Sequence, residues 1–421
     1  MNSEWERRRI GQLGRVITGK TPSTKRSEYF GGGIPFITIP DMHNQVHIYR
    51  TERTLTGAGA ETVRSALLPA DSVMMSCIAT IGRCGITTRA SVTNQQINSV
   101  VCSDDVHPRF LYYTFRQLGQ QLEAAGGGGS VYTNVSKSRF SDLTVPLPPL
   151  AEQKAIAHIL GTLDDKIEVN RRMNETLEAM ARAVFKSWFV DFDPVRAKAR
   201  AKANGTSPEE ALAEAGISPH LAPLFPDEFE DSPLGPIPKG WEVKKVGDVC
   251  EFAYGKALRA GDRIEGPFPV MGSNGVVGLH NDYLVEGPGI IVGRKGNPGT
   301  VVYQSKSFYP IDTTFYVKHD RNQLPVSFLF LALASLDLPS LSADSAVPGL
   351  NRNIAYMTDI LLPPADVLAR YEGTFQALQG QVRVNLEEGS SLAGVRDTLL
   401  PKLLSGEVRV KEAEAEVAEV E

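Results

Sequence analysis

The sequence predicts an α+β protein in which two copies of one β-rich module are joined by two long helices that pair as an antiparallel coiled coil. Three observations support this prediction: an internal duplication, short β-type fragments within each copy, and an apolar heptad pattern after each copy. The chain has 421 residues, and at about 100 to 200 residues per domain this length suits several domains.

The duplication is visible as residues that recur in the same order and spacing. Near the start of each copy the matched residues are Trp5, Gly11, Gly19 and Lys20 with Trp241, Gly247, Gly255 and Lys256. Near the end of each copy they are Asn134, Asp142 and Pro146 with Asn351, Asp359 and Pro363. The order along the chain is therefore module, helix, module, helix.

Each module is predicted to be rich in strands. Residues 34–39 and 289–293 are β-type fragments, and glycines and prolines punctuate the sequence around them. The modules, residues 1–150 and 241–364, both end on a Pro-Pro pair, which stops a strand and suits the start of a helix. These prolines mark the predicted domain boundaries.

Two spacer helices are predicted at residues 151–195 and 365–406, because apolar positions there alternate at steps of four and three. The first seam is Ile156, Leu160, Leu163, Ile167, Asn170, Asn174, Leu177, Ala181, Val184 and Trp188. The second seam is Tyr371, Phe375, Leu378, Val382, Asn385, Gly389, Leu392, Arg396, Leu399 and Leu403. The alternative is that each helix packs only on its own module.

Asn170 and Asn385 occupy equivalent seam positions, where a buried amide fixes the register of a coiled coil. A helix of about 38 residues would be roughly 57 Å long and could act as a rigid spacer. Residues 196–240 are rich in Ala, Pro and charge and are predicted to be a linker, and residues 407–421 an acidic tail.

Composition is that of an ordinary globular protein, with 42% hydrophobic and 22% charged residues. The sequence has no long apolar run and no secretory signal at its start, so a cytoplasmic location is expected. The four cysteines have irregular spacing and are expected to be free thiols. The net charge is −5, but residues 1–150 carry more Lys and Arg than Asp and Glu, so a polyanionic ligand is not excluded.

Three patterns resemble catalytic or metal sites but lack the required context. Residues 14–21 fit the phosphate-loop pattern, yet no buried strand precedes them and Pro22 follows. Pro226-Asp227 with Glu242 to Lys244 resembles nuclease carboxylates, but it begins in a Pro-rich segment. Asp41, His43 and His47 lack further ligands of suitable spacing. We therefore expect no catalytic residue and no metal site.

The remaining candidates are basic and amide side chains in polar, glycine-hinged loops of both modules. Arg and Lys bind phosphates or guanine edges, and Asn and Gln bind adenine edges, so this set suits reading of the DNA major groove. The candidates are Lys20, Arg83, Gln95, Gln96, Asn98, Asn134, Lys137, Lys256, Arg259, Asn274, Arg294, Lys295, Asn297, Asn351 and Arg352.

The duplication, the stretches VPLPPLAEQKAIAHILGTLDDKIEVNRRMNETLEAMARAVFKSWFVDFDPV and LFPDEFEDSPLGPIPKGWEVKKVGD, and the run LLPKLLSGEV resemble the specificity subunit of a type I restriction-modification system. The resemblance covers nearly the whole chain. It implies that each module is a target-recognition domain for one half of a split, asymmetric DNA site, and that the coiled coil sets the gap.

The resemblance also implies that this chain is not an enzyme and holds no cofactor. Two modification subunits would carry S-adenosylmethionine and the methyltransferase centre, and restriction subunits would use ATP and magnesium for translocation and cleavage. Gly389 and Arg396 on the second seam depart from uniform coiled-coil packing. Two alternatives stay open: a stand-alone DNA methyltransferase or nuclease with duplicated recognition domains, and a scaffold that joins two β modules without binding DNA.

Overall fold

The computed structural model describes residues 5–43, 45–126, 134–341 and 349–413. It divides into two compact units, Met1–Met173 with Val384–Glu421 and Asn174–Arg383, and each is described by itself. Each unit contains one module, and the α+β class with duplicated modules is confirmed.

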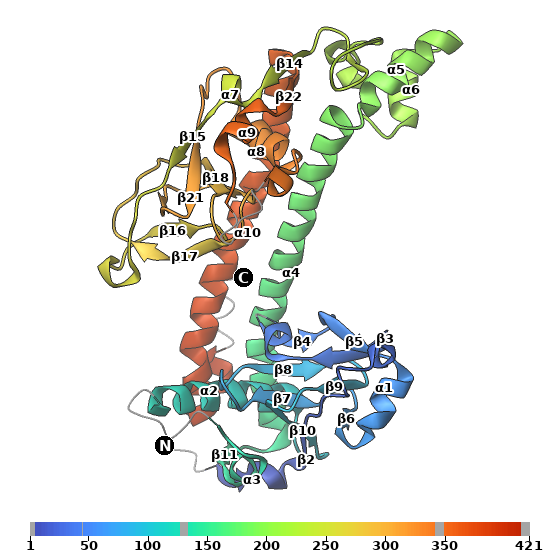
Figure 1. Cartoon of the computed structure of the whole chain (residues 1–421). Helices are drawn as coiled ribbons and strands as arrows, with labels where there is room; N and C mark the ends of the chain where they lie inside the picture. The colour runs from blue at the N-terminus through green and yellow to red at the C-terminus, as the bar shows by residue number, and fades with distance from the viewer. Residues whose placement is uncertain (1–4, 44, 127–133, 342–348, 414–421) are drawn as a thin grey trace. The chain divides into compact units, whose positions relative to one another are not determined.

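The first unit contains two sheets (Figure 1). One has the strand order β2-β10-β7-β8-β4 and the other β5-β3-β9-β6, while β1 pairs with β11 outside both. The strands are β1 (Glu6–Arg9), β2 (Gly14–Thr18), β3 (Phe30–Ile37), β4 (His47–Ile48), β5 (Arg53–Leu55), β6 (Leu67–Leu68), β7 (Val73–Ser76), β8 (Cys84–Thr87), β9 (Ser91–Thr93), β10 (Ile97–Cys102) and β11 (Thr144–Leu147). The helices are α1 (Gly57–Thr62), α2 (Pro108–Gly126), α3 (Lys137–Asp142) and the first part of α4 (Leu150–Phe189).

The second unit repeats this plan with one strand fewer in its main sheet. Its main sheet has the order β15-β21-β18-β19, which matches β2-β10-β7-β8, and β14 pairs with β22 as β1 does with β11. The strands are β12 (Phe229–Glu230), β13 (Ile237–Pro238), β14 (Glu242–Lys245), β15 (Glu251–Tyr254), β16 (Phe268–Gly272), β17 (Gly275–His280), β18 (Gly289–Gly293), β19 (Val301–Gln304), β20 (Tyr309–Pro310), β21 (Thr314–Lys318) and β22 (Asp359–Leu362). The helices are α5 (Asp193–Asn204), α6 (Pro208–Glu214), α7 (Val246–Val249), α8 (Val326–Ala334), α9 (Arg352–Met357) and α10 (Ala365–Ser405).

Helices α4 and α10 run through both units and pack against each other in each of them. In the first unit Asn170 Nδ2 donates to the backbone oxygen of Asn385 at 3.5 Å and to Glu388 Oε2 at 2.7 Å. In the second unit the Phe185 and Tyr371 rings lie 5.9 Å apart. Every predicted seam residue is buried or half-buried, which confirms the antiparallel coiled coil. The role of the two asparagines in fixing register stays a prediction.

The helices also form part of each module's core. The alternative in which each helix packs only on its own module is wrong, because the helices pair as well. Leu160, Leu163 and Leu399 share one buried cluster with Phe110 and Phe115 of α2. A second cluster joins Phe185, Phe189, Tyr371 and Phe375 with Phe328 of α8. In the first unit, α2 lies against both helices (Figure 1). The module and its half of the coiled coil therefore share one hydrophobic core.

The seam departure at Arg396 has a specific cause. Its Nη1 donates to Asp164 Oδ1 at 2.6 Å, and Tyr113 Oη donates to Asp164 Oδ2 at 2.6 Å. The side chains of Arg396 and Asp164 are 11% and 5% exposed. A buried ion pair thus replaces an apolar contact at this position.

The predicted helix 151–195 is too long at its C-terminal end, and the predicted linker 196–240 is largely helical. Phe192 adopts a left-handed conformation with φ 55°, which ends α4 at Phe189 and starts α5 at Asp193. Residues after it are rich in Ala, Arg and Lys, which favour helix. Ser207 then caps α6, accepting hydrogen bonds from Glu209 N and Glu210 N. The predicted tail 407–421 is described only as far as residue 413.

Candidate nucleic-acid interface

The loop between β18 and β19 carries three of the candidate residues and has a counterpart in the first module. Arg294, Lys295 and Asn297 lie in it, and the loop between β7 and β8 carries Arg83. The tight turn needs glycine, since Gly299 has φ +80° and a Cβ atom there would lie 2.3 Å from Pro339 N. The β18–β19 loop and its counterpart, the β7–β8 loop, therefore present different side chains in the two modules.

Arg294 and Arg352 come together at one aromatic ring in the second module. Their Cζ atoms lie 4.9 Å and 5.0 Å from the ring centroid of Tyr254, the last residue of β15. Leu350 N also donates to Arg294 O at 3.0 Å, which ties the segment before α9 to the β18–β19 loop. Tyr254 was missed by the sequence analysis, which considered only basic and amide side chains.

The other six candidates of the second module occupy loops beside these strands. Asn297 Nδ2 donates to Asn274 Oδ1, and Lys295 forms an isolated bridge with Gly349. Asn351 caps α9, accepting hydrogen bonds from Asn353 N and Ile354 N. Lys256 and Arg259 are also exposed, in the segment that follows β15. These side chains keep donors available for a ligand.

In the first module, exposed candidates surround the end of β2. Lys20 Nζ donates to Ser65 Oγ at 2.9 Å, and Thr21 Oγ1 donates to Gln95 Oε1 at 2.6 Å. Gln96 is half-buried and accepts a hydrogen bond from Asn94 Nδ2. Asn134 forms an isolated bridge with Ile78 in the β7–β8 loop, and Lys137, the first residue of α3, is exposed.

Asn98 corrects the predicted set. It is 3% exposed on β10, where its Oδ1 accepts from Thr18 Oγ1 at 2.6 Å and its Nδ2 donates to Val135 O at 3.5 Å. A buried amide must be hydrogen-bonded, and here those bonds are made within the module. Asn98 therefore serves the packing of the domain, and we remove it from the candidate contacts.

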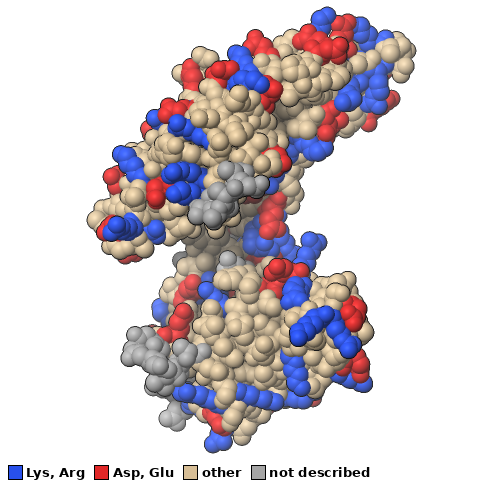
Figure 2. Space-filling model, viewed as in Figure 1, with Lys and Arg blue, Asp and Glu red and all other residues tan. Residues whose placement is uncertain are grey.

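The surface of the first module suits an anionic partner. Lys25, Arg50, Arg83 and Arg89 are exposed and form no ion pair among the described residues. Figure 2 shows Lys and Arg atoms in connected runs on the visible face of this unit. Unpaired positive charge of this kind attracts the phosphates of nucleic acid.

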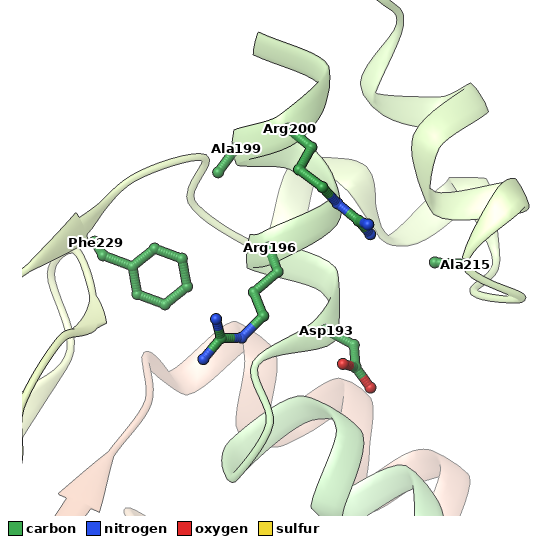
Figure 3. Close-up of a pocket in the computed structure, with 6 residues that line it drawn as sticks. All are labelled: Asp193, Arg196, Ala199, Arg200, Ala215 and Phe229. Carbon is green, nitrogen blue, oxygen red and sulfur yellow. The ribbon is translucent and has the colours of Figure 1, made fainter. Parts of the chain in front are cut away.

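One hollow of the second unit lies away from the candidate residues. A hollow of about 670 Å³ lies beside α5 and is lined by Asp193, Arg196, Ala199, Arg200, Ala215 and Phe229 (Figure 3). Arg196 is held there by a hydrogen bond from its Nε to Asp191 O at 2.7 Å, and its guanidinium faces the Phe229 ring. Its lining has no histidine, cysteine, serine or lysine.

Among the described residues, no group of three or more His, Cys, Asp or Glu side chains could hold a metal ion. All four cysteines are free, as expected. Burial raises the pKa of Cys77 to about 11 and that of Cys250 to about 12, so these thiols are neutral rather than nucleophilic. Among the described residues, no helix is long and apolar enough to span a membrane.

Residues 2–179 and 238–367 match the family described as the type I restriction modification DNA specificity domain. The chain belongs to that family. It is a DNA-specificity subunit of a type I restriction-modification system, as its sequence resemblance implies.

Known specificity subunits resemble this one over its whole length or over one part. The MjaIX specificity subunit of Methanocaldococcus jannaschii is 29% identical and covers 97% of this chain and 94% of its own. The HindI specificity subunit of Haemophilus influenzae is 38% identical over 178 residues, 41% of this chain and 39% of its own. The crystal structure of an S subunit from M. genitalium has the same fold, with a TM-score of 0.53, 18% identity and coverage of 96% and 97%.

These relatives are all named specificity subunits of type I restriction enzymes. This agrees with the prediction that the chain is the recognition subunit and not an enzyme. The comparisons give no support to a stand-alone methyltransferase or nuclease, or to a scaffold that does not bind DNA.

Proposed function

We propose that the specificity subunit reads a split, asymmetric DNA site, with one module on each half and the coiled coil setting the number of unread base pairs between them. The observation that carries this proposal is the repeated sheet with different loop side chains. Tyr254 and Arg294 occupy positions of the second module that are Thr18 and Cys77 in the first. Two modules with the same scaffold but different loop side chains suit the recognition of two different half-site sequences.

Each module would enter the major groove through the loops that carry the candidate residues. Lys20 and Arg83 in the first module and Lys256, Arg259 and Lys295 in the second are exposed and suit phosphate or base contacts. The hydrogen-bonded asparagines Asn274 and Asn297 suit base edges.

Partner subunits would supply the chemistry. Val169 and Met173 lie one turn apart on α4, outside the seam, and are 50% and 43% exposed. Exposed apolar side chains at this spacing suit docking of a partner helix. We propose that such helical surfaces bind two modification subunits, which hold S-adenosylmethionine, and that the assembly recruits restriction subunits, which use ATP and magnesium. A cytoplasmic location would give this chain access to DNA.

The experiment is selection of random duplex DNA by the purified full chain, followed by affinity measurements at several salt concentrations. We expect a motif of two defined segments around an undefined spacer, with affinity that falls steeply as salt rises because phosphate contacts release counterions. A single uninterrupted motif, or the absence of any sequence preference, would contradict the proposal.

A further inference from the structure

Tyr254 is an unusual aromatic residue because it is half exposed and contacts two arginines. Its side chain is 50% exposed, and the Phe315 ring packs against it with centroids 5.0 Å apart. The guanidinium groups of Arg294 and Arg352 lie at cation–π distance from the same ring. We call these three residues, Tyr254, Arg294 and Arg352, the tyrosine–arginine cluster.

Two positive charges share this ring without an acidic partner among the described residues. Like charges brought this close repel each other, so the arrangement is more favourable when an electron-rich ligand is bound. Each guanidinium is also fixed by one backbone carbonyl: Arg294 Nη1 donates to Asp312 O at 3.0 Å and Arg352 Nη1 to Phe252 O at 3.3 Å. An arginine has five N–H donors, so most remain free for a ligand.

The first module has the same positions but different chemistry. The ladders pair Tyr254 with Phe315 in one module and Thr18 with Asn98 in the other. The counterpart of Arg294 is Cys77, which is 2% exposed. The counterpart of Arg352 is Lys137, since each is the first residue of its helix, and Lys137 is exposed. The first module therefore has one cation here but lacks the aromatic ring and the arginine that follows the strand.

This difference between the modules bears on whether the cluster binds DNA phosphates or base edges. The DNA backbone is the same along both half-sites, so residues that only bind phosphates need not differ between two copies of one scaffold. Base edges do differ between half-sites, and guanine presents O6 and N7 to a guanidinium group in the major groove. A tyrosine–arginine cluster found in one module alone therefore suits base recognition.

We propose that the tyrosine–arginine cluster is the base-reading element of the second module: Arg294 and Arg352 bind guanine edges in the second half-site, and Tyr254 positions both guanidinium groups. This inference rests on the proposed function, since it requires that the second module reads one half of the DNA site.

The test selects random duplex DNA with the full chain and with the variants Arg294→Gln and Arg352→Gln. We expect the wild-type motif to contain guanine in one half-site, and each variant to lose a guanine preference of roughly tenfold or more at one position. The other half-site should be unchanged. If both variants keep the wild-type motif and only bind more weakly with a smaller salt dependence, the arginines bind phosphates and the inference is wrong.

Arg321→Gln is the matched control. Arg321 lies in the same module and is exposed, and its Nη2 donates to Glu286 O and Pro288 O at the start of β18, whereas Arg294 follows the end of that strand. This variant removes the same charge and should keep the wild-type motif. A loss of the same guanine in Arg321→Gln would also overturn the inference, because net charge alone would then explain the effect.

Four further variants separate positioning from folding. Tyr254→Phe keeps the ring and should keep the motif, whereas Tyr254→Leu should weaken the guanine preference. Arg294→Lys and Arg352→Lys keep the charge but not the planar fork, so they should lose the preference even where a glutamine variant does not fold. Retention of the full preference in both lysine variants would contradict the inference. A wild-type chain that selects no split motif would instead contradict the proposed function.

Discussion

Single residues connect the first module to the helix pair. Tyr113 and Arg116 of α2 contact Asp164 of α4 and Asp397 of α10, and Arg396 bonds to both of these carboxylates. Arg109 adds a pair with Asp165, with its Nη2 at 2.6 Å from Oδ1. Because Asp164 and Arg396 are almost fully buried, loss of either partner leaves an uncompensated charge.

We predict that Arg396→Ala lowers the free energy of unfolding by about 3–5 kcal/mol, the cost of breaking a buried ion pair. Urea unfolding of the full chain measures this change. The control is Arg172→Ala, which removes an exposed partner of Glu168 and should cost about 1 kcal/mol or less. Equal effects of the two variants would contradict the importance of burial at Arg396.

Three half-buried histidines predict a loss of stability in acid. Burial, more than any neighbouring charge, lowers the pKa of His47, His107 and His319. Both ring nitrogens of His319 are buried and have no hydrogen-bond partner in the part of the chain that the structure describes. Below the unfolded pKa of about 6.5, the unfolded chain takes up protons that the folded chain resists, so the free energy of unfolding falls as pH falls.

The measurement compares urea unfolding at pH 7.5 and pH 5.5 for the wild-type chain and for His319→Leu. The wild type should be less stable at the lower pH, and the variant should lose less stability over the same interval. An identical pH dependence in both proteins would show that His319 does not contribute.

At the level of elements, the sequence predicted the helices better than the segments between them. The heptad pattern locates α4 and α10 because a buried seam imposes its own spacing on the sequence. The helix α5 was predicted as linker because its exposed face is charged, although Val195, Ala197 and Ala201 bury the other face. The sequence around Tyr254 does not indicate its role, since that role depends on arginines brought together from two other segments.

The paired asparagines give a prediction for the coiled coil. Replacing both Asn170 and Asn385 by Leu should raise the melting temperature, since apolar side chains pack better on a seam. The same change should relax the choice of spacer length in selected DNA, because a slipped register no longer leaves an amide unpaired. A lower melting temperature, or an unchanged spacer distribution, would contradict a register role.

At the level of the whole molecule, the helix pair is proposed to set the spacing of the two half-sites. A matched deletion tests this: residues 171–177 and 378–384 face each other if Asn170 lies opposite Asn385, and removing both keeps the heptad phase. The helices shorten by about 10 Å at 1.5 Å per residue, which is roughly three base pairs. We expect the selected spacer to shorten while both half-site sequences persist. An unchanged spacer would contradict the proposal.

The central claim is that this chain alone decides which split DNA sequence its system modifies. The most direct measurement is methylation mapping of a host genome with and without this chain, in the presence of its modification subunits. We predict a new methylated motif of two unlike segments around a fixed spacer, present only when the chain is present. Methylation that does not change with the chain, or that falls on one continuous motif, would contradict it.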